Sequence, residues 1–280
     1  MLSKFVVSAL RSAYRAWPVK GGSEFPGRVG AFAAKQGIVR AEWVEFQPGL
    51  WMQLDAGDLI QQTILFEGIW DPLLTQLITS TLKPGGTFVD IGAHVGYCTL
   101  IAAQAVGPSG RVLAAEPNPG SVAKVQAHLK KNKFTNVILE STAMGDSTQP
   151  VTLFLDSGSN SGLASLSKEN VKCDKGFAVP CNRLDDLVVK HGLTAIDLIK
   201  VDVEGAELSV LKGMAEVLRR FRPVVVIELE PDLLKSFAVS TDDVVEHLAG
   251  FDYTVTPLGG HANYVCHPSE KVTAHIQPRA

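Results

Sequence analysis

The arrangement of apolar and polar positions changes at about residue 58. Beyond that point, short apolar runs alternate with longer segments in which apolar residues recur at helical spacing. Strands buried on both faces read as continuous apolar runs, and helices between such strands are typical of a parallel sheet. Helices are expected at 59–70, 73–82, 97–105, 121–131, 183–191, 206–219 and 241–248, and strands at 87–91, 111–116, 136–140, 197–201 and 223–228. This alternation predicts a doubly wound α/β sheet.

Three stretches depart from the alternation. Near the C-terminus, 253–257 and 262–266 are strand-like and predict a closing antiparallel hairpin. Residues 145–181 hold one further strand, at 151–155, and a polar loop. Between 38 and 55, strand-like segments turn at Pro48-Gly49. We therefore expect a seven-stranded, mostly parallel sheet in one domain, 59–280, preceded by an N-terminal extension, 1–58.

The extension begins with apolar residues at helical spacing from Leu2 to Trp17, with basic residues between them. This pattern is typical of an amphipathic helix that docks on its own protein or on a partner subunit. A membrane-surface helix or a transit peptide is the alternative. A linker is expected at 18–30, and we expect the extension to cover the site or to form a homodimer.

Composition narrows the classes of function. The 280 residues carry 26 Lys and Arg against 29 Asp and Glu, a net charge of −3, which disfavours nucleic acid as the main partner. No apolar run reaches the length of a membrane span, so no integral membrane association is expected. The four cysteines lack metal-ligand spacing, which favours reduced thiols in a cytoplasmic protein.

The most informative stretch runs from Thr87 to Tyr97 (TFVDIGAHVGY), where an apolar run ends in an acid and a glycine-punctuated turn follows. A nicotinamide-binding turn needs glycines at positions held here by His94 and Tyr97. The spacing Asp90-x-Gly92-x-x-x-Gly96 instead suits a ligand with an amino-acid tail. Asp90 would accept from its ammonium, amides of the turn would meet its carboxylate, and Thr99 would add a hydroxyl.

Other predicted strands also end in acids, namely Glu116, Asp202 and Glu228. Ligands of open parallel sheets bind outside the carboxyl ends of the strands, so these acids should line one crevice. Glu116 would accept the two hydroxyls of a ribose there. The alternative is that Asp90 and Glu116 only cap neighbouring turns.

Four segments, 88–97, 115–119, 143–146 and 197–207, closely resemble the FkbM-type family of S-adenosylmethionine-dependent methyltransferases, and the block KVDVEGAE is the most specific. The resemblance covers about 59–253 and implies a Rossmann-like class I methyltransferase fold. One departure is His94, where such proteins usually carry Asn, and through it pH dependence would enter.

The resemblance also implies which residues bind the cofactor, S-adenosylmethionine. Asp90, Gly92 and Gly96 would surround its methionine part, and Glu116 would hold the ribose. Asn118 and the backbone near Ala143-Met144 would meet the adenine, although Met144 is equally compatible with a place in the hydrophobic core. The complete expected set is Asp90, Gly92, Ala93, His94, Gly96, Tyr97, Thr99, Glu116, Pro117, Asn118, Ala143, Met144 and Asp202.

A second charged cluster follows the strand at 197–201. Side chains alternate along a strand, so Lys200, Asp202 and Glu204 would share one face. Asp202, Glu204 and Glu228 are the candidates for a base that activates an acceptor hydroxyl. Lys200 would orient one of them or, if burial lowers its pKa, act as the base itself. The alternative is an ion-pair network that only holds the turn.

Clustered carboxylates would also suit Mg²⁺. The spacing does not separate a metal site from an ion-pair network, and the metal-free interpretation is favoured.

The resemblance implies an O-methyltransferase acting on a hydroxyl of a small molecule, a sugar or a natural-product scaffold. A methyltransferase of RNA or protein and a cofactor-binding partner without catalytic activity are the alternatives. An apolar acceptor pocket or ordinary core packing would account for Phe46, Leu50, Trp51, Phe66 and Trp70.

Overall fold

The computed structural model describes residues 41–155, 164–171, 175–259 and 262–270. The helix expected at 2–17, the linker at 18–30 and the polar loop at 157–162 therefore lie outside the described residues. No helix within the described ranges is long and apolar enough to cross a membrane.

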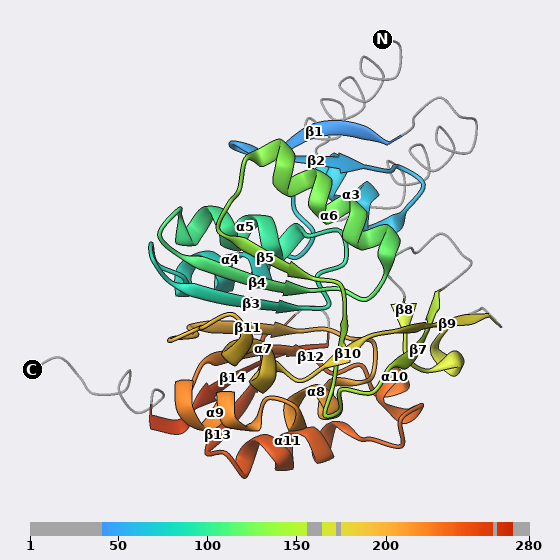
Figure 1. Cartoon of the computed structure of the whole chain (residues 1–280), viewed down its shortest axis with the longest axis vertical. Coiled ribbons are helices and arrows are strands. Elements are labelled where there is room, and N and C mark those ends of the chain that lie inside the picture. The colour runs from blue at the N-terminus through green and yellow to red at the C-terminus, as the bar shows by residue number, and fades with distance from the viewer. Residues whose placement is uncertain (1–40, 156–163, 172–174, 260–261, 271–280) are drawn as a thin grey trace, which may run out of the picture.

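A seven-stranded sheet forms the centre of the protein, in the order β13-β14-β12-β11-β3-β4-β5 (Figure 1). Five strands are parallel: β3 (Thr87–Ile91), β4 (Arg111–Ala115), β5 (Val137–Glu140), β11 (Leu198–Val201) and β12 (Val224–Glu228). β13 (Tyr253–Pro257) and β14 (Asn263–Pro268) form the antiparallel hairpin at one edge. The predicted fold class is confirmed.

The chain runs outward from β3 to β4 and β5, and then returns to the other side of β3 to form β11 and β12. The order therefore reverses between β3 and β11. Such a switch point leaves a crevice outside the carboxyl ends of the strands, which is where ligands of open α/β sheets bind.

Helices cover both faces of the sheet because successive strand residues point to opposite sides. Phe88 lies in the core shared with α3 (Leu59–Glu67), α4 (Pro72–Thr81) and α5 (Tyr97–Val106). Its neighbour Val89 lies in the core shared with α7 (Leu184–Lys190), α8 (Glu207–Lys212), α9 (Ala215–Phe221) and α11 (Thr241–Ala249). α10 (Pro231–Lys235) follows β12.

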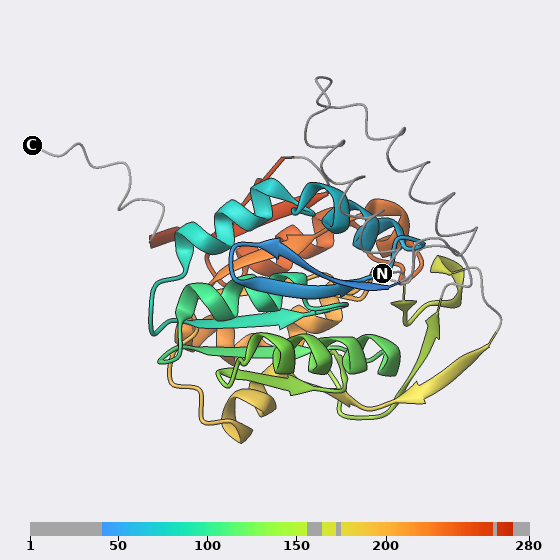
Figure 2. The same ribbon diagram turned by 90° about the horizontal axis from the view of Figure 1, so that it is seen from above.

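A hairpin of β1 (Glu42–Gln47) and β2 (Leu50–Leu54) packs alongside α6 (Pro119–Asn132), as the view from above shows (Figure 2). The side chain of Asn132 bonds both the N–H and the carbonyl of Trp51, and His128 Nε2 accepts from Gln53 N. Phe46 and Leu50 are buried in the same core as Phe88. The hairpin turns at Pro48-Gly49 as predicted, and it shares its core with the sheet; the boundary at residue 58 stays a prediction.

Residues 143–182 form an insertion between β5 and α7. β6 (Ala143–Met144) pairs in parallel with β10 (Cys181–Asn182). Between them, β7 (Val151–Leu155) pairs antiparallel with β8 (Ala164–Ser165) and β9 (Gly176–Val179). A 3₁₀ turn, η1 (Lys168–Asn170), follows β8. A small apolar core around Leu153 holds this insertion together.

Two helix predictions need correction. The helix expected at 206–219 is two helices, α8 and α9, and a Cβ at Gly213 between them would lie 1.9 Å from the carbonyl oxygen of Gly145. α6 begins at Pro119, capped by Asn118, whose side chain accepts from Gly120 N. Proline at the first helical position explains this earlier start.

Candidate active site

Two adjoining cavities open at the switch point. The first, of about 700 Å³, lies between the ends of β3 and β4 and the insertion. The second, of about 660 Å³, lies between the start of α4 and the ends of β11 and β12. The cavities share four lining residues: Ile60, Gly92, His94 and Asp202. These residues form the partition between the two cavities.

Two of the four shared residues, Gly92 and His94, belong to the glycine turn, residues 92–96. Gly92 has φ of +80°, and a Cβ there would lie 1.8 Å from the carbonyl oxygen of Asp202. Only glycine tolerates both the left-handed backbone and this close approach. The turn therefore packs directly against the chain that follows β11.

The amides of the glycine turn bond within the protein. Gly92 N and Ala93 N both donate to the carbonyl of Ala115, and Gly96 N donates to that of Ala93. The first turn of α5 has no side-chain cap, and its residues Tyr97 and Cys98 line the second cavity. An uncapped helix N-terminus attracts anions. The amides of Gly92, Ala93 and Gly96 are therefore already bonded, and the start of α5 is the part of this turn that suits a ligand carboxylate.

Glu116 borders the first cavity, at the end of β4. Its Oε2 accepts from His94 N at 2.8 Å and its Oε1 from Asn118 N at 2.8 Å. Burial raises its pKa to about 7. A carboxylate has about four lone-pair sites, so Glu116 keeps acceptor capacity toward the cavity.

His94 stands in the glycine turn with φ of 50°, a backbone conformation in which Asn and His are enriched. Burial, the largest influence, lowers its pKa to about 4, although the charge of Asp58 acts in the opposite direction. The imidazole is therefore neutral near pH 7. The expected pH dependence through His94 falls well below neutral pH.

A buried ion pair lies beneath the turn. Lys200 Nζ is 3.1 Å from Asp202 Oδ2 and 3.8 Å from Asp90 Oδ1, and it donates to the carbonyl of Gly92 at 3.1 Å. Thr99 Oγ1 donates to Asp90 Oδ2 at 2.5 Å. Burial raises the pKa of Asp90, although Lys200 and Thr99 act against it.

The charge of Lys200 follows from its partners. Burial by itself would lower its pKa, but the charges of Asp202 and Asp90 outweigh burial and raise it. Lys200 thus stays protonated, and the suggestion that it acts as the base is wrong. Its ammonium lies 3.1 Å from Asp202 Oδ2, and the other sequence-based interpretation, that Lys200 orients an acid of the cluster, stays a prediction.

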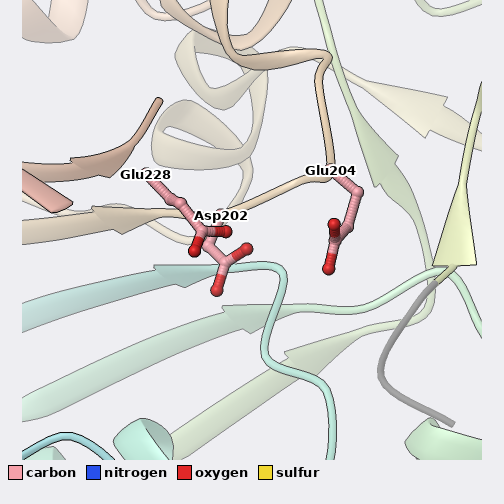
Figure 3. A group of neighbouring side chains, drawn as sticks. All are labelled: Asp202, Glu204 and Glu228. Atoms are coloured by element: carbon pink, nitrogen blue, oxygen red, sulfur yellow. The ribbon is translucent and has the colours of Figure 1, made fainter. Parts of the chain in front are cut away.

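Asp202, Glu204 and Glu228 come together as the sequence predicts. One oxygen of each lies within 4.8 Å of the others. Figure 3 shows the carboxyl groups of Asp202 and Glu228 side by side, with Glu204 reaching to the same side from the loop. Asp202 faces both cavities, Glu204 the first and Glu228 the second.

The three carboxyl groups differ in charge. Burial alone would raise the pKa of Asp202, but Lys200 and a hydrogen bond with Glu228 hold it below its usual value. The negative charge of Asp202, followed by burial, raises the pKa of Glu228 to about 9. Burial, followed by the charge of Asp202, raises the pKa of Glu204 to about 8. One ionised carboxylate thus sits between two that are protonated at neutral pH.

The acidic loop, residues 202–206, presents Asp202 and Glu204, whereas Glu228 is the last residue of β12. The sequence-based expectation was extended backbone through Glu204, but β11 ends at Val201 and Glu204 has φ of 56°. Glu207 Oε1 accepts from Val203 N and Gly205 N, both at 3.1 Å. Burial raises the pKa of Glu207 to about 7. The prediction of the cluster was right, but the reason for it was wrong.

Most of the expected site residues line the cavities: Gly92, Ala93, His94, Tyr97, Glu116, Pro117, Ala143, Met144, Lys200, Asp202, Glu204 and Glu228. Asp90, Gly96, Thr99 and Asn118 do not. Asp90 is fully buried behind the glycine turn, and Thr99 supports it there.

Sequence reasoning missed several lining residues. Ser121 entered only as the first residue of the helix expected at 121–131, and Thr142, Asp71 and Asn263 were not singled out. Asp71 has one local signal, since it caps α4 just before Pro72. Asn263 has none, because only the fold brings its amide to Asp71 Oδ2 at 3.0 Å.

The three carboxylates supply the kind of oxygen ligands that Mg²⁺ prefers. Lys200 already places a positive charge 3.1 Å from Asp202 Oδ2. A divalent cation would share that carboxylate with the ammonium or displace it. The metal-free interpretation therefore remains the favoured one.

The chain is similar in sequence to known methyltransferases. A family model described as the methyltransferase FkbM domain matches residues 90–255. The chain is 33% identical over 159 residues to methyltransferase sdnD of Sordaria araneosa, covering 46% of this chain and 60% of the relative. It is 27% identical over 160 residues to 2-O-methyltransferase NoeI of Sinorhizobium fredii, covering 52% and 65%. The chain thus spans 60–65% of the length of these two relatives.

Two further matches extend over more of the chain. 31-O-demethyl-FK506 methyltransferase FkbM of Streptomyces tacrolimicus is 27% identical over 202 residues, covering 62% of this chain and 75% of the relative. Among solved structures, a methyltransferase FkbM from Methylobacillus flagellatus KT has a TM-score of 0.46 at 16% identity, covering 94% of this chain and 70% of that one.

Proposed function

Since this chain belongs to the FkbM methyltransferase family, we propose that it uses S-adenosylmethionine to methylate a hydroxyl group of a small molecule. One observation carries the proposal. The wall between the two cavities holds an ionised carboxylate, Asp202, and Glu204 and Glu228 border one cavity each.

The residues present fit the cofactor. Glu116 keeps free acceptor sites for ribose hydroxyls in the first cavity, where Thr142, Ala143 and Met144 offer a surface for the adenine. The uncapped start of α5 in the second cavity suits the carboxylate of the methionine part. When bound, S-adenosylmethionine supplies a methyl group on a positively charged sulfur.

The carboxyl cluster suits that positive charge. A cation within about 4–6 Å lowers the pKa of a carboxyl group by ~1–3 units. Glu204 and Glu228, protonated at neutral pH in the free protein, would then ionise beside the bound cofactor. Among the described residues that line the cavities, Lys200 is the only lysine or arginine, and it is already paired.

Glu204 is the proposed proton acceptor for the hydroxyl. It faces the first cavity, and its raised pKa makes it a stronger base than Asp202, which Lys200 holds ionised. A positioned base accelerates such a step by about 10²–10⁴-fold. Alignment of the two reactants contributes about 7–11 kcal/mol more to lowering the barrier.

Two observations support a small-molecule acceptor. Apolar side chains of the insertion, Leu153, Ala164 and Leu166, line the first cavity beside Glu204. The names of two relatives specify O-methylation, one of them of 31-O-demethyl-FK506. A sugar or a natural-product scaffold is the proposed class. The homodimer through the extension and the cytoplasmic location stay predictions.

Of the five apolar residues considered for an acceptor pocket, Trp70 is the one that borders a cavity. It lines the second cavity, whereas Phe46, Leu50 and Phe66 are buried in the core. Trp51 stacks beneath Lys131.

Calorimetric titration with S-adenosylmethionine and S-adenosylhomocysteine, with NAD as control, tests the cofactor assignment. Micromolar binding of both sulfur ligands without NAD binding supports it, and binding of neither refutes it. Transfer of a labelled methyl group to a panel of sugars and polyketides then tests the acceptor class. Repeating the assay with EDTA and with added Mg²⁺ tests the metal-free interpretation.

The rival functions give different results in the same assay. A macromolecular methyltransferase would label cell RNA or protein in preference to small molecules. A catalytically silent partner would bind the cofactor and label nothing.

A further inference from the structure

The backbone of Glu204 is held from outside its own loop. Its carbonyl accepts from Ser165 Oγ at 2.9 Å and from Asn170 Nδ2 at 2.9 Å. Glu204 also has a left-handed backbone, which is unfavourable for a residue with a Cβ. Two donors from a distant segment therefore stabilise a conformation that the residue would not adopt alone.

The two donors belong to one compact segment of the insertion. Ser165 is fully buried in β8, where it pairs with Phe154 of β7. Asn170 closes η1, and its amide also donates to Ser165 Oγ and to the carbonyl of Leu233, each at 3.2 Å. Ser167 N completes the network by donating to Ser165 Oγ.

The same segment forms part of the cavity wall. Ala164 and Leu166, on either side of Ser165, line the first cavity together with Glu204. On the far side of the acidic loop, Glu207 holds Val203 N and Gly205 N. Glu204 is thus fixed between the start of α8, which follows its loop, and the insertion.

We propose that Ser165 and Asn170 are positioning residues for Glu204: by holding its carbonyl they keep its carboxyl group at the partition with Asp202 and Glu228. This inference rests on the proposed function, in which Glu204 acts beside the bound cofactor. It also makes the insertion a specificity element, because the segment that lines the cavity sets the position of the reacting carboxylate.

The test compares two ligands that differ in charge at sulfur. S-adenosylmethionine is a sulfonium and S-adenosylhomocysteine is neutral there, so the ratio of their affinities reports negative charge near the sulfur. The ratio is measured by calorimetry in EDTA-containing buffer for the wild type, Glu204→Gln, Ser165→Ala, Asn170→Ala and the control Ser167→Ala. Ser167 caps the same turn, where its hydroxyl accepts from Glu169 N.

In Glu204→Gln, the ratio of S-adenosylmethionine affinity to S-adenosylhomocysteine affinity should fall about tenfold. A nearby cation shifts the pKa of a carboxyl group by about one unit or more, which corresponds to a tenfold change in binding. Ser165→Ala and Asn170→Ala should each lower this ratio about threefold, since the carboxylate is displaced rather than removed. Both should keep S-adenosylhomocysteine affinity within about twofold, which shows that the fold and the cofactor site persist. Ser167→Ala should behave as the wild type.

Three results would overturn the inference. If Glu204→Gln loses the preference but Ser165→Ala and Asn170→Ala keep it, the two residues do not position Glu204. If they lose affinity for both ligands equally, their role is only structural. If Glu204→Gln itself keeps the preference, Glu204 does not lie near the sulfur. Absence of binding of either ligand to the wild type would instead refute the proposed function.

Discussion

The glycine turn and the acidic loop meet at the same edge of the sheet, but different kinds of contact hold them. The glycine turn depends on backbone packing, with Gly92 N and Ala93 N bonded to the neighbouring strand, and Glu116 and Lys200 add side-chain bonds to His94 N and Gly92 O. The acidic loop is fixed by side chains: Glu207 at the start of the adjoining helix α8, and Ser165 and Asn170 from the insertion. A turn fixed by backbone depends on which residues are glycine, whereas a loop fixed by side chains depends on residues far away in the sequence.

Gly92→Ala tests the glycine turn and should have the largest effect. The new methyl would overlap the carbonyl of Asp202, and the backbone would become strained. We expect a loss of about 3–5 kcal/mol in the free energy of unfolding, measured by urea denaturation.

Gly192→Ala is the matched control for Gly92→Ala. Gly192 has φ of +60°, but nothing lies within 4 Å of the position that a Cβ would take there. We expect it to cost only about 1 kcal/mol. Equal losses for the two variants would show that backbone strain alone, and not the close approach to Asp202, makes Gly92 necessary.

Glu204→Gln tests the acidic loop. The substitution should remove the proposed base while leaving the fold intact. The rate of methyl transfer should fall about 10²–10⁴-fold, with S-adenosylhomocysteine affinity unchanged. In the wild type, kcat/KM should rise with pH up to the pKa of Glu204, about 8 in the free protein, because the base must lose its proton. The variant should lack that rise, and a rise that persists would assign the base to another group.

Asp202→Asn tests the neighbouring carboxylate of the same cluster. It removes the ionised carboxylate that Lys200 holds, so the pKa of Glu228 should fall toward its ordinary value. A loss of turnover with cofactor affinity kept would also eliminate the catalytically silent alternative.

The pH dependence of stability compares the two regions directly. Glu116 beside the glycine turn and Glu207 beside the acidic loop both have a pKa of about 7 in the folded protein. A carboxyl group whose pKa is raised on folding binds more protons in the folded than in the unfolded state. Stability of the ligand-free protein should therefore be greatest below the ordinary carboxyl pKa and fall as pH rises through about 7.

Thermal unfolding of Glu116→Gln and Glu207→Gln across this range separates the two contributions. Each variant should flatten the decline by up to ~1 kcal/mol per pH unit. A decline that neither variant changes would place its origin in Glu204 and Glu228.

His94→Asn should have the smallest effect. The imidazole is neutral above its pKa of about 4, so a neutral amide that also tolerates left-handed backbone should replace it well. Affinity for S-adenosylhomocysteine should change less than about twofold between pH 6 and 9. A change that depends on pH in this range would show that His94 titrates in the bound state.

The sequence allowed the central sheet to be predicted within about one residue at most strand ends, because strands such as 224–228 are unbroken apolar runs. It did not allow the break at Gly213 to be predicted, since the carbonyl that requires it comes from Gly145. The acids at the strand ends could be found by their spacing. The charge of Lys200 could not, because it depends on how near Asp90 and Asp202 lie in the folded chain.

Ser165 and Asn170 carry no local signal of their function. Each is an ordinary polar residue in the stretch 145–181, which departs from the alternation of strands and helices, and only the fold brings both to Glu204. Contacts between segments that are more than 30 residues apart lie beyond what periodicity or spacing can reveal.

The pairing of β6 with β10 has a consequence for how this protein can change. Residues 143 and 181 are neighbours in a parallel pair, so the chain leaves the central fold and re-enters it at one place. The entropy of closing such a loop grows only slowly with its length. The chain between β6 and β10 can therefore change in length without altering the central sheet, provided that Ser165 and Asn170 keep their bonds to Glu204.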